Sequence, residues 1–134
     1  MPDATRDTAV PNAGKGGGLE FMARPWRPGE AIDSPLLLGR GRVPAKWIDP
    51  NGHMGLSSYC AAMMEAGKYW LEYLGLGYLN VGRTGRSSFA LQFQMNLKRE
   101  LLEGADIAFH CRLLDWGHKA FHYFITLENE TEGY

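Results

Sequence analysis

The stretch that decides the fold runs from Ile48 to Met54 and reads IDPNGHM, immediately ahead of a long helical pattern. It places a carboxylate (Asp49), a turn and an imidazole (His53) at the start of that helix. Backbone N–H groups at a helix start lack intrahelical partners, and the helix macrodipole favours negative charge there. An oxygen that becomes anionic during acyl transfer is stabilised at such a junction. The junction therefore indicates acyl chemistry.

The helical pattern has apolar residues at steps of three and four positions. It predicts one helix over residues 57–74, with Ser57 or Ser58 as the N-cap. Gly75 suits the left-handed position after a helix end, and Leu76 suits the hydrophobic contact of a Schellman motif. Small residues make parts of the helix surface nearly smooth, so a sheet can approach it closely. We therefore expect the sheet to wrap this helix.

Alternation of apolar and polar residues predicts that sheet. A short apolar run over residues 36–43 predicts a first strand ahead of the helix. After the helix, the alternation predicts further strands over residues 89–97, 107–113 and 121–127, joined by turns. The order is strand, helix and antiparallel meander, which leaves an open sheet edge. Such an edge invites pairing with a partner chain or aggregation.

Length and composition narrow the possible classes. The chain of 134 residues with a net charge of -1 suits one domain without a general affinity for nucleic acid or anionic membranes. It has neither a membrane-spanning apolar stretch nor a signal-like block, so a cytoplasmic location is expected. Cys60 and Cys111 are interpreted as reduced core thiols rather than as a disulfide or a nucleophile. Residues 1–34 are expected to form a mobile tail, with RPWRP at 24–28 touching the folded body.

Several short motifs carry a family resemblance. They are VPAKWIDPNGHM at 43–54, SSY at 57–59, LGLG at 74–77 and NLKREL at 96–101, followed by Glu103 and Gly104. Together they resemble the 4-hydroxybenzoyl-CoA thioesterase-like group of acyl-CoA thioesterases, and most of all thioesterases of carnitine and betaine breakdown. The resemblance covers about residues 36–130. It implies an α+β hotdog fold, in which an antiparallel sheet wraps one long central helix, over residues 35–134 and without the final strand of relatives.

The resemblance also implies an activity. Members hydrolyse acyl-CoA thioesters, so a small polar acyl-CoA, such as a quaternary-ammonium acyl-CoA, is the expected substrate, with no metal and no redox cofactor. Relatives assemble as homodimers or homotetramers, with the active site between the helix start of one subunit and a strand of its neighbour. A hotdog dehydratase or hydratase and a non-catalytic or degenerate acyl-CoA-binding protein stay open as alternatives. The non-catalytic reading is favoured by Gly55, which stands where relatives commonly have Asn.

Asp49 is the first catalytic candidate, because the resemblance places the essential carboxylate of the family there. It would act as a general base on water, or as a nucleophile that forms a mixed anhydride. Without the resemblance, an Asx turn that binds the backbone of Asn51 and Gly52 explains Asp49 better. Gly52 and His53 are expected to offer backbone N–H groups to the thioester carbonyl. The His53 side chain either braces the turn or orients the substrate.

The remaining candidates concern substrate binding. Asn51 is one candidate for a contact with the substrate. Coenzyme A carries phosphates, so a few cationic side chains are expected at the rim of the site. Each such cation, taken singly, is slightly better explained as solvated charge. A quaternary ammonium group would be held by aromatic faces. The candidate cations are Arg83, Arg86, Lys98 and Arg99, and the candidate aromatic residues are Trp47, Tyr59, Tyr69 and Trp70, although helix aromatics more often pack in a core. His110, His118 and His122 lack the spacing of zinc ligands.

Overall fold

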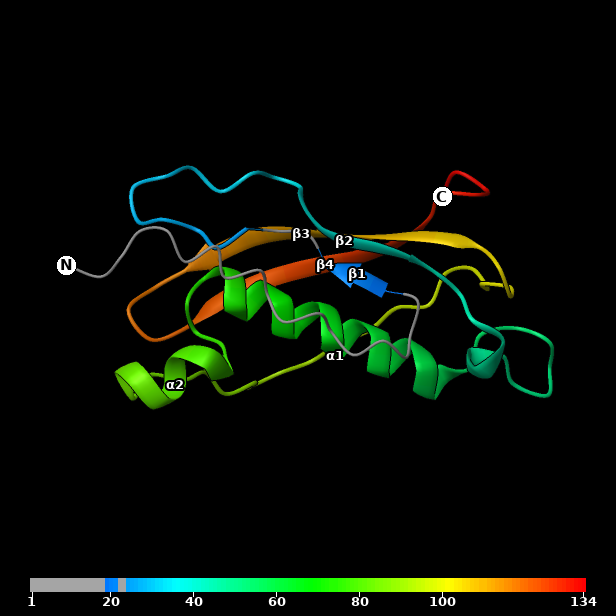
Figure 1. The fold of residues 1–134 in the computed structure, drawn as a ribbon, viewed down its shortest axis with the longest axis horizontal. Helices are drawn as coiled ribbons and strands as arrows, with labels where there is room; N and C mark the ends of the chain where they lie inside the picture. Colours follow the sequence, from blue (N-terminus) through cyan, green and yellow to red (C-terminus); the bar gives the residue numbers. More distant parts are fainter. Residues whose placement is uncertain (1–18, 22–23) are drawn as a thin grey trace.

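The computed structural model describes residues 19–21 and 24–134. Within these residues, four antiparallel strands form one sheet in the order β1-β2-β3-β4. The long helix α1 (Leu56–Tyr73) lies along one face of this sheet (Figure 1). The predicted combination of an antiparallel sheet and one long helix is confirmed. The strands are Leu19–Phe21 (β1), Leu36–Arg42 (β2), Asp106–Trp116 (β3) and Phe121–Asn129 (β4), and a 3-10 helix at Ala45–Trp47 and the short helix α2 at Tyr78–Thr84 flank α1.

Helix α1 begins one residue earlier than its pattern predicts. Gly55 is the N-cap, with an extended backbone and no side-chain cap, so the predicted N-caps Ser57 and Ser58 are wrong. The backbone N–H of Gly55 donates to the Trp47 carbonyl at 3.0 Å, which fixes the chain direction just before the helix. The start of α1 is therefore set by a backbone contact rather than by a hydroxyl cap.

The end of α1 follows the prediction. Gly75 has a φ of 76°, in the left-handed region. Its N–H donates to the Glu72 carbonyl at 3.0 Å, and the Leu76 N–H donates to the Leu71 carbonyl at 2.9 Å. These two bonds are the pair that defines a Schellman motif, so the predicted ending is confirmed.

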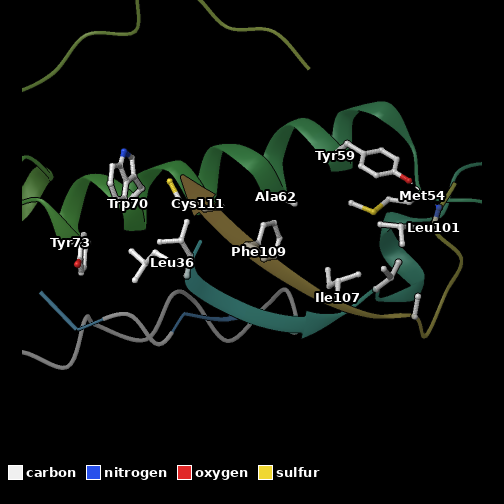
Figure 2. Packing of buried hydrophobic residues seen from close by; sticks show 14 residues of the cluster. Leu36, Met54, Tyr59, Ala62, Trp70, Tyr73, Leu101, Ile107, Phe109 and Cys111 are labelled. Atoms are coloured by element: carbon white, nitrogen blue, oxygen red, sulfur yellow. Dashed lines mark hydrogen bonds between the residues drawn. The ribbon is translucent and has the colours of Figure 1, made fainter. Parts of the chain in front are cut away.

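The core lies between α1 and the sheet (Figure 2). Trp70 from α1 is fully buried and meets the inward-facing side of β3, where Ile107 and Phe109 are also fully buried. Full burial of a large apolar side chain stabilises a fold by about 1.5–3 kcal/mol. Cys111 lies in the same row of β3 and is buried, whereas Cys60 is half-buried, and both are free thiols. The alternation predicted for residues 107–113 thus places the core side of β3 correctly.

The strand predicted over residues 89–97 is wrong. Residues 85–105 contain neither helix nor strand. Phe89, Leu91 and Phe93 are 85%, 82% and 64% exposed. A period-two pattern supplies suitable side chains, but a strand also needs the N–H and C=O groups of a neighbouring strand. No strand of the described part of the chain pairs with this segment, so most of its apolar side chains are exposed, whereas Met95 is partly buried against the core.

Strand β1 falls within the segment predicted as a tail. Leu19–Phe21 pairs with β2 through Gly39, Arg40 and Gly41. A Cβ at Gly39 would lie 2.7 Å from Phe21 Cδ1 and 2.9 Å from Phe21 Cα, so the absence of a side chain there lets β1 approach. Residues 1–18 and 22–23, the rest of the predicted tail up to Arg24, lie outside the described residues.

The predicted contact of the RPWRP segment with the body is confirmed. The Trp26 backbone N–H donates to the Tyr73 carbonyl at 2.8 Å, and the Trp26 side chain is partly buried against the core. No described helix combines the length and the apolar character that crossing a membrane requires.

Candidate active site at the start of helix α1

The loop ahead of α1 is closed by backbone contacts at its base. Ile48 and Met54 form an isolated antiparallel bridge, and the Asp49 N–H donates to the His53 carbonyl at 2.9 Å. The Met54 N–H donates to the Leu101 carbonyl at 2.8 Å, and Figure 2 shows these two residues beside the start of α1. The five residues from Asp49 to His53 therefore project from a fixed base.

The Asp49 carboxylate forms the Asx turn that sequence reasoning left as an alternative. Its Oδ1 atom accepts a hydrogen bond from the Asn51 backbone N–H at 2.8 Å, and the Asn51 side-chain amide lies 3.5 Å from Oδ2. This turn leaves Oδ2 without a short bond and directs it toward the helix. A Cβ at Gly55 would lie 3.6 Å from Oδ2, so the half-buried carboxylate sits beside the N-cap of α1. The positive end of the helix macrodipole lies at this end of α1.

The unpaired N–H groups near this carboxylate match those predicted only in part. The Gly52 N–H donates to the Asp49 carbonyl at 3.0 Å, so it is already engaged within the turn. The N–H groups of His53, Leu56 and Ser57 have no hydrogen-bond partner among the described residues. Leu56 and Ser57 are the first residues of α1 and were missed, because the sequence pattern put the helix start later. A helix start at residue 56 identifies both, since the first-turn N–H groups of any helix lack intrahelical partners.

The His53 imidazole lies against its own loop. Its Nδ1 atom is 3.4 Å from the Met54 carbonyl oxygen, and the side chain is partly buried. This contact agrees with the bracing role considered for His53, and a role in orienting the substrate stays a prediction.

The aromatic candidates fall into two groups. Tyr59 is 7% exposed, and its hydroxyl accepts a hydrogen bond from the Leu101 N–H at 2.9 Å. Burial raises the Tyr59 pKa, which keeps the phenol neutral. Tyr69 stacks on Phe21 with ring centroids 4.1 Å apart, and Trp70 is fully buried. These three side chains pack within the fold.

Trp47 is the aromatic candidate that lies nearest to Asp49 along the chain. It ends the 3-10 helix, is partly buried against the core and has its carbonyl bound to the N–H of Gly55. Its ring thus remains partly accessible at the start of α1, next to the loop that carries the carboxylate.

The four candidate cations lie at opposite ends of α1. Lys98 and Arg99 are exposed and precede Leu101, which contacts the first turns of the helix. Arg99 also lies over the Tyr134 ring, at 4.3 Å from its centroid. Arg83 and Arg86 lie in and after α2, beyond the other end of α1 (Figure 1). A helix of 18 residues is about 27 Å long, so one chain does not bring both pairs to Asp49.

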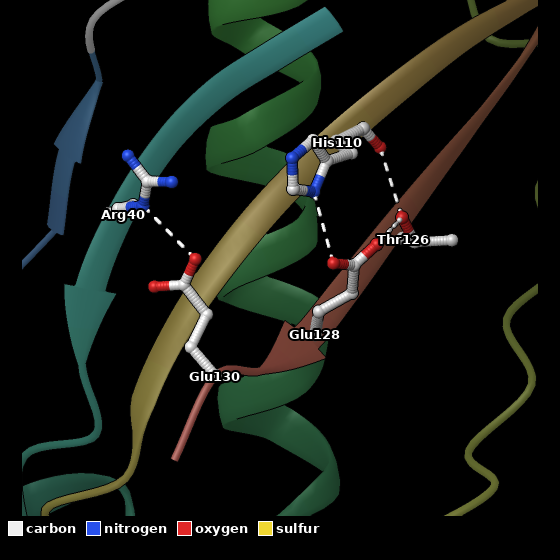
Figure 3. A network of polar contacts seen from close by, with 5 residues as sticks. All are labelled: Arg40, His110, Thr126, Glu128 and Glu130. Carbon is white, nitrogen blue, oxygen red and sulfur yellow. Dashed lines mark hydrogen bonds and ion pairs between the residues drawn. The ribbon is translucent and has the colours of Figure 1, made fainter. Parts of the chain in front are cut away.

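Polar side chains on the sheet face turned away from α1 form a separate network (Figure 3). His110 Nδ1 lies 3.3 Å from Glu128 Oε2, and the Thr126 hydroxyl donates to Glu128 Oε1 at 3.1 Å. Arg40 pairs with Glu130 at 3.1 Å. Within the described residues, His, Cys, Asp and Glu side chains form no cluster suited to a metal ion.

Comparison with curated proteins finds relatives whose names include a thioesterase activity. A betainyl-CoA thioesterase of Pseudomonas aeruginosa is 30% identical over 80 residues, which cover 60% of this chain and 50% of that protein. An L-carnitine dehydrogenase/betainyl-CoA thioesterase of Rhizobium meliloti is 26% identical over 133 residues, 91% of this chain and 27% of that protein. The chain thus spans half the length of the first relative and about a quarter of the second.

Comparison with solved structures and with family profiles agrees on the fold. A crystal structure of a protein described as a thioesterase, from Pseudomonas putida KT2440, matches with a TM-score of 0.60 and 23% identity, covering 72% of this chain and 62% of that one. The profile of the thioesterase-like superfamily matches residues 43–134. That match spans the loop with Asp49, helix α1 and strands β3 and β4, which make up most of the described chain. The chain therefore belongs to the thioesterase-like superfamily and has its hotdog fold.

Proposed function

We propose that this chain hydrolyses an acyl-CoA thioester at the start of α1, with Asp49 as the reacting carboxylate. One observation carries the proposal: the Asp49 side chain lies beside Gly55, next to the unpaired N–H groups of Leu56 and Ser57. A thioesterase needs a base or nucleophile and hydrogen-bond donors for the oxyanion in the same place. Membership of the thioesterase-like superfamily supports this assignment.

Two routes fit these groups. In the first, Asp49 takes a proton from water as the water oxygen bonds to the thioester carbonyl carbon, and the carbonyl oxygen becomes an oxyanion. The N–H groups of Leu56 and Ser57 stabilise that oxyanion. The C–S bond then breaks, and the coenzyme A thiolate takes the proton back from Asp49. In the second, the carboxylate attacks the carbonyl carbon and releases the thiolate, and water hydrolyses the mixed anhydride.

The proposed substrate is a small polar acyl-CoA, and a quaternary-ammonium acyl group is the first choice. The relatives named as betainyl-CoA thioesterases support this choice. Trp47 supports it as well, because its partly exposed ring lies close to Asp49 along the chain. A cation over such a ring contributes about 0.5–2 kcal/mol. Lys98 and Arg99 are the proposed phosphate contacts, because they lie toward this end of α1.

We further propose that the active protein is a homodimer or homotetramer. Phe89, Leu91 and Phe93 expose large apolar side chains in consecutive alternate positions. Exposed apolar patches of this kind mark association surfaces or aggregation sites. A second copy on this segment would cover the patch, and Arg83 and Arg86 would then be candidates for phosphate contacts from the neighbouring subunit.

The decisive experiment is Asp49→Asn, with Glu65→Gln, which alters a half-buried carboxylate farther along α1, as the matched control. Thiol release from betainyl-CoA and acetyl-CoA is measured beside the melting temperature. We expect Asp49→Asn to lower kcat by about 100-fold or more, since general acid–base catalysis contributes about 10²–10⁴. The melting temperature should hold, because the Asn side-chain oxygen can keep the turn to residue 51. Undiminished turnover contradicts the proposal, and binding of coenzyme A esters without thiol release in the unchanged chain would make it a binding protein instead.

A further inference from the structure

A cavity of about 320 Å³ lies at the end of α1 opposite to Asp49. Its volume is at the lower end of the range for small-molecule sites, about 300–1,000 Å³. The cavity and the proposed thioester site lie at the two ends of α1, whose first and last residues are about 26 Å apart along the helix axis. The cavity therefore belongs to a different site on the same chain. Its lining residues are Arg24, Glu30, Ala31, Asp33, Leu36 and Tyr73.

The loop segment from Arg24 to Glu30 is held in place around the cavity. The Trp26 N–H donates to the Tyr73 carbonyl at 2.8 Å, which ties this loop to the last residue of α1. The Trp26 indole N–H donates to the Glu30 carbonyl at 2.9 Å. The Arg24 guanidinium pairs with the Glu30 carboxylate at 3.1 Å, so the charge of Glu30 is already matched. One wall of the cavity is thus a folded loop with internal bonds.

The charge of the lining favours a cation. Asp33 has no ion-pair or hydrogen-bond partner among the described residues, so its negative charge adds to a neutral Arg24–Glu30 pair. The last turn of α1 contains no basic side chain. The negative end of the helix macrodipole is therefore not compensated by the helix itself. Both contributions act in the same direction at this end of α1.

The Tyr73 hydroxyl supplies a hydrogen-bonding group in the cavity wall. Tyr73 is 8% exposed, its ring stacks near Trp70 with centroids 5.8 Å apart, and its hydroxyl has no hydrogen-bond partner in the described part of the chain. Burial, and then the negative charge of Asp33, raise the Tyr73 pKa, so the phenol is neutral near pH 7. The Tyr73 oxygen is not among the buried unpartnered polar atoms of the described residues, so it is accessible to a ligand, and a neutral hydroxyl oxygen accepts hydrogen bonds.

We propose that this cavity binds a small ligand with a protonated primary amine. The ammonium N–H groups bond to the Asp33 carboxylate and to the Tyr73 hydroxyl oxygen, and the aliphatic part of the ligand packs against Ala31 and Leu36. A divalent metal ion fits less well, because one unmatched carboxylate and one phenol supply too few oxygen ligands. A quaternary ammonium ion also fits less well, because it has no N–H to donate.

The test uses n-butylammonium chloride as the probe on the full chain, at constant ionic strength. Isothermal titration measures affinity, and NMR shifts of the Trp26 indole N–H report the location. We expect saturable binding of butylammonium to the unchanged chain. The affinity should be at least about tenfold weaker for tetramethylammonium, and for butylammonium with Asp33→Asn, because a hydrogen bond between charged groups is lost. Tyr73→Phe should weaken binding as well. The matched controls, Asp115→Asn and Tyr78→Phe, should leave it unchanged.

Three results would each overturn this proposal: no saturation with butylammonium, equal affinity for tetramethylammonium, or unchanged affinity in Asp33→Asn. Asp33 is exposed, so the Asp33→Asn variant is expected to fold. The proposal can therefore be tested even if Tyr73→Phe is unstable. The outcome is independent of thioester hydrolysis, because none of the altered residues lies at the start of α1.

Discussion

The Tyr59 hydroxyl and the Leu101 backbone join the first turns of α1 to the chain just before β3, through a hydrogen bond of 2.9 Å. The Leu101 carbonyl accepts a second bond, from the Met54 N–H at 2.8 Å. Leu101 is 4% exposed, so water does not replace either bond easily. The base of the Asp49 loop, the helix start and the segment before β3 are therefore held to one another.

Tyr59→Phe removes the acceptor and leaves the buried Leu101 N–H without a partner. We expect the free energy of unfolding to fall by about 1–3 kcal/mol, the cost of an unpaired buried polar group. Urea denaturation followed by circular dichroism measures it. Tyr78→Phe is the control, because Tyr78 is 80% exposed, and its change should stay within about 0.5 kcal/mol. Similar losses of unfolding free energy in the two variants would show that the hydrogen bond between Tyr59 and Leu101 does not stabilise the fold.

Gly77→Ala should weaken the attachment of α2 to α1. An added Cβ would overlap the Glu72 carboxylate, whose Oε1 atom accepts a bond from the Leu79 N–H at 3.4 Å. We expect a loss of about 1 kcal/mol in the free energy of unfolding, at the low end for overpacked sites, because the Glu72 carboxylate ends a flexible side chain that can move aside.

Removing the obstructing side chain tests the cause of that loss. In a double-mutant cycle with Glu72→Ala, the second Gly77→Ala substitution should cost clearly less than it does alone, with a coupling of about 0.5–3 kcal/mol. Gly82→Ala, in the middle of α2 with open space around it, should instead stabilise by up to about 1 kcal/mol. Strictly additive effects at residues 72 and 77 would rule out the proposed overlap.

Cys111 makes stability fall with pH in the alkaline range. Burial raises the pKa of the Cys111 thiol from 9.0 to about 12, so at pH 10 the unfolded chain releases a proton that the folded chain keeps. The unfolded state then binds fewer protons, and the free energy of unfolding falls as pH rises above 9, by about 1.4 kcal/mol at pH 10. Denaturation at pH 8 and pH 10 should show this difference. It should shrink in Cys111→Ala and persist in Cys60→Ala, and an identical pH dependence in Cys111→Ala would contradict the assignment.

Gly39→Ala should release β1 from the sheet. The added methyl group would meet the backbone and ring of Phe21, which leaves β1 no room beside β2. Hydrogen exchange of the amides of Leu19–Phe21 should accelerate, while that of β3 and β4 stays slow. Gly117→Ala serves as the control, because the nearest atom to its Cβ would be 4.0 Å away. Unchanged protection of β1 in Gly39→Ala would show that the strand adapts.

Local signals in the sequence predicted the parts of the fold that depend on local structure. The spacing of apolar residues identified α1, and Gly75 with Leu76 identified its end, because a Schellman motif involves only neighbouring residues. The alternation in β3 and β4 was also sufficient, since these strands follow each other and pair directly. Residues 89–97 show the limit of that signal, because a strand depends on a partner that periodicity does not reveal.

Other features depend on contacts between distant residues. Strand β1 has only three residues, too few to show a period, and its place depends on the missing side chain of Gly39. At the candidate site, the Asx turn of Asp49 was readable, because its partner lies two residues away. The separation of Arg83 from Lys98 was not readable, since it depends on the path of the chain around α1. The engagement of the Gly52 N–H also appeared only in the structure.

The contact between Gly55 and Asp49 makes the side chains allowed at these two positions depend on each other. A Cβ at residue 55 would lie 3.3 Å from the Asp49 Cβ, tighter than most such contacts, so Asp49 must shift by a few tenths of an ångström to accept a side chain there. Installing the Asn of relatives at position 55 alone would therefore change the aim of the carboxylate. Because a side chain at position 55 and the Asp49 side chain share this space, we expect substitutions at the two positions to have non-additive effects on stability.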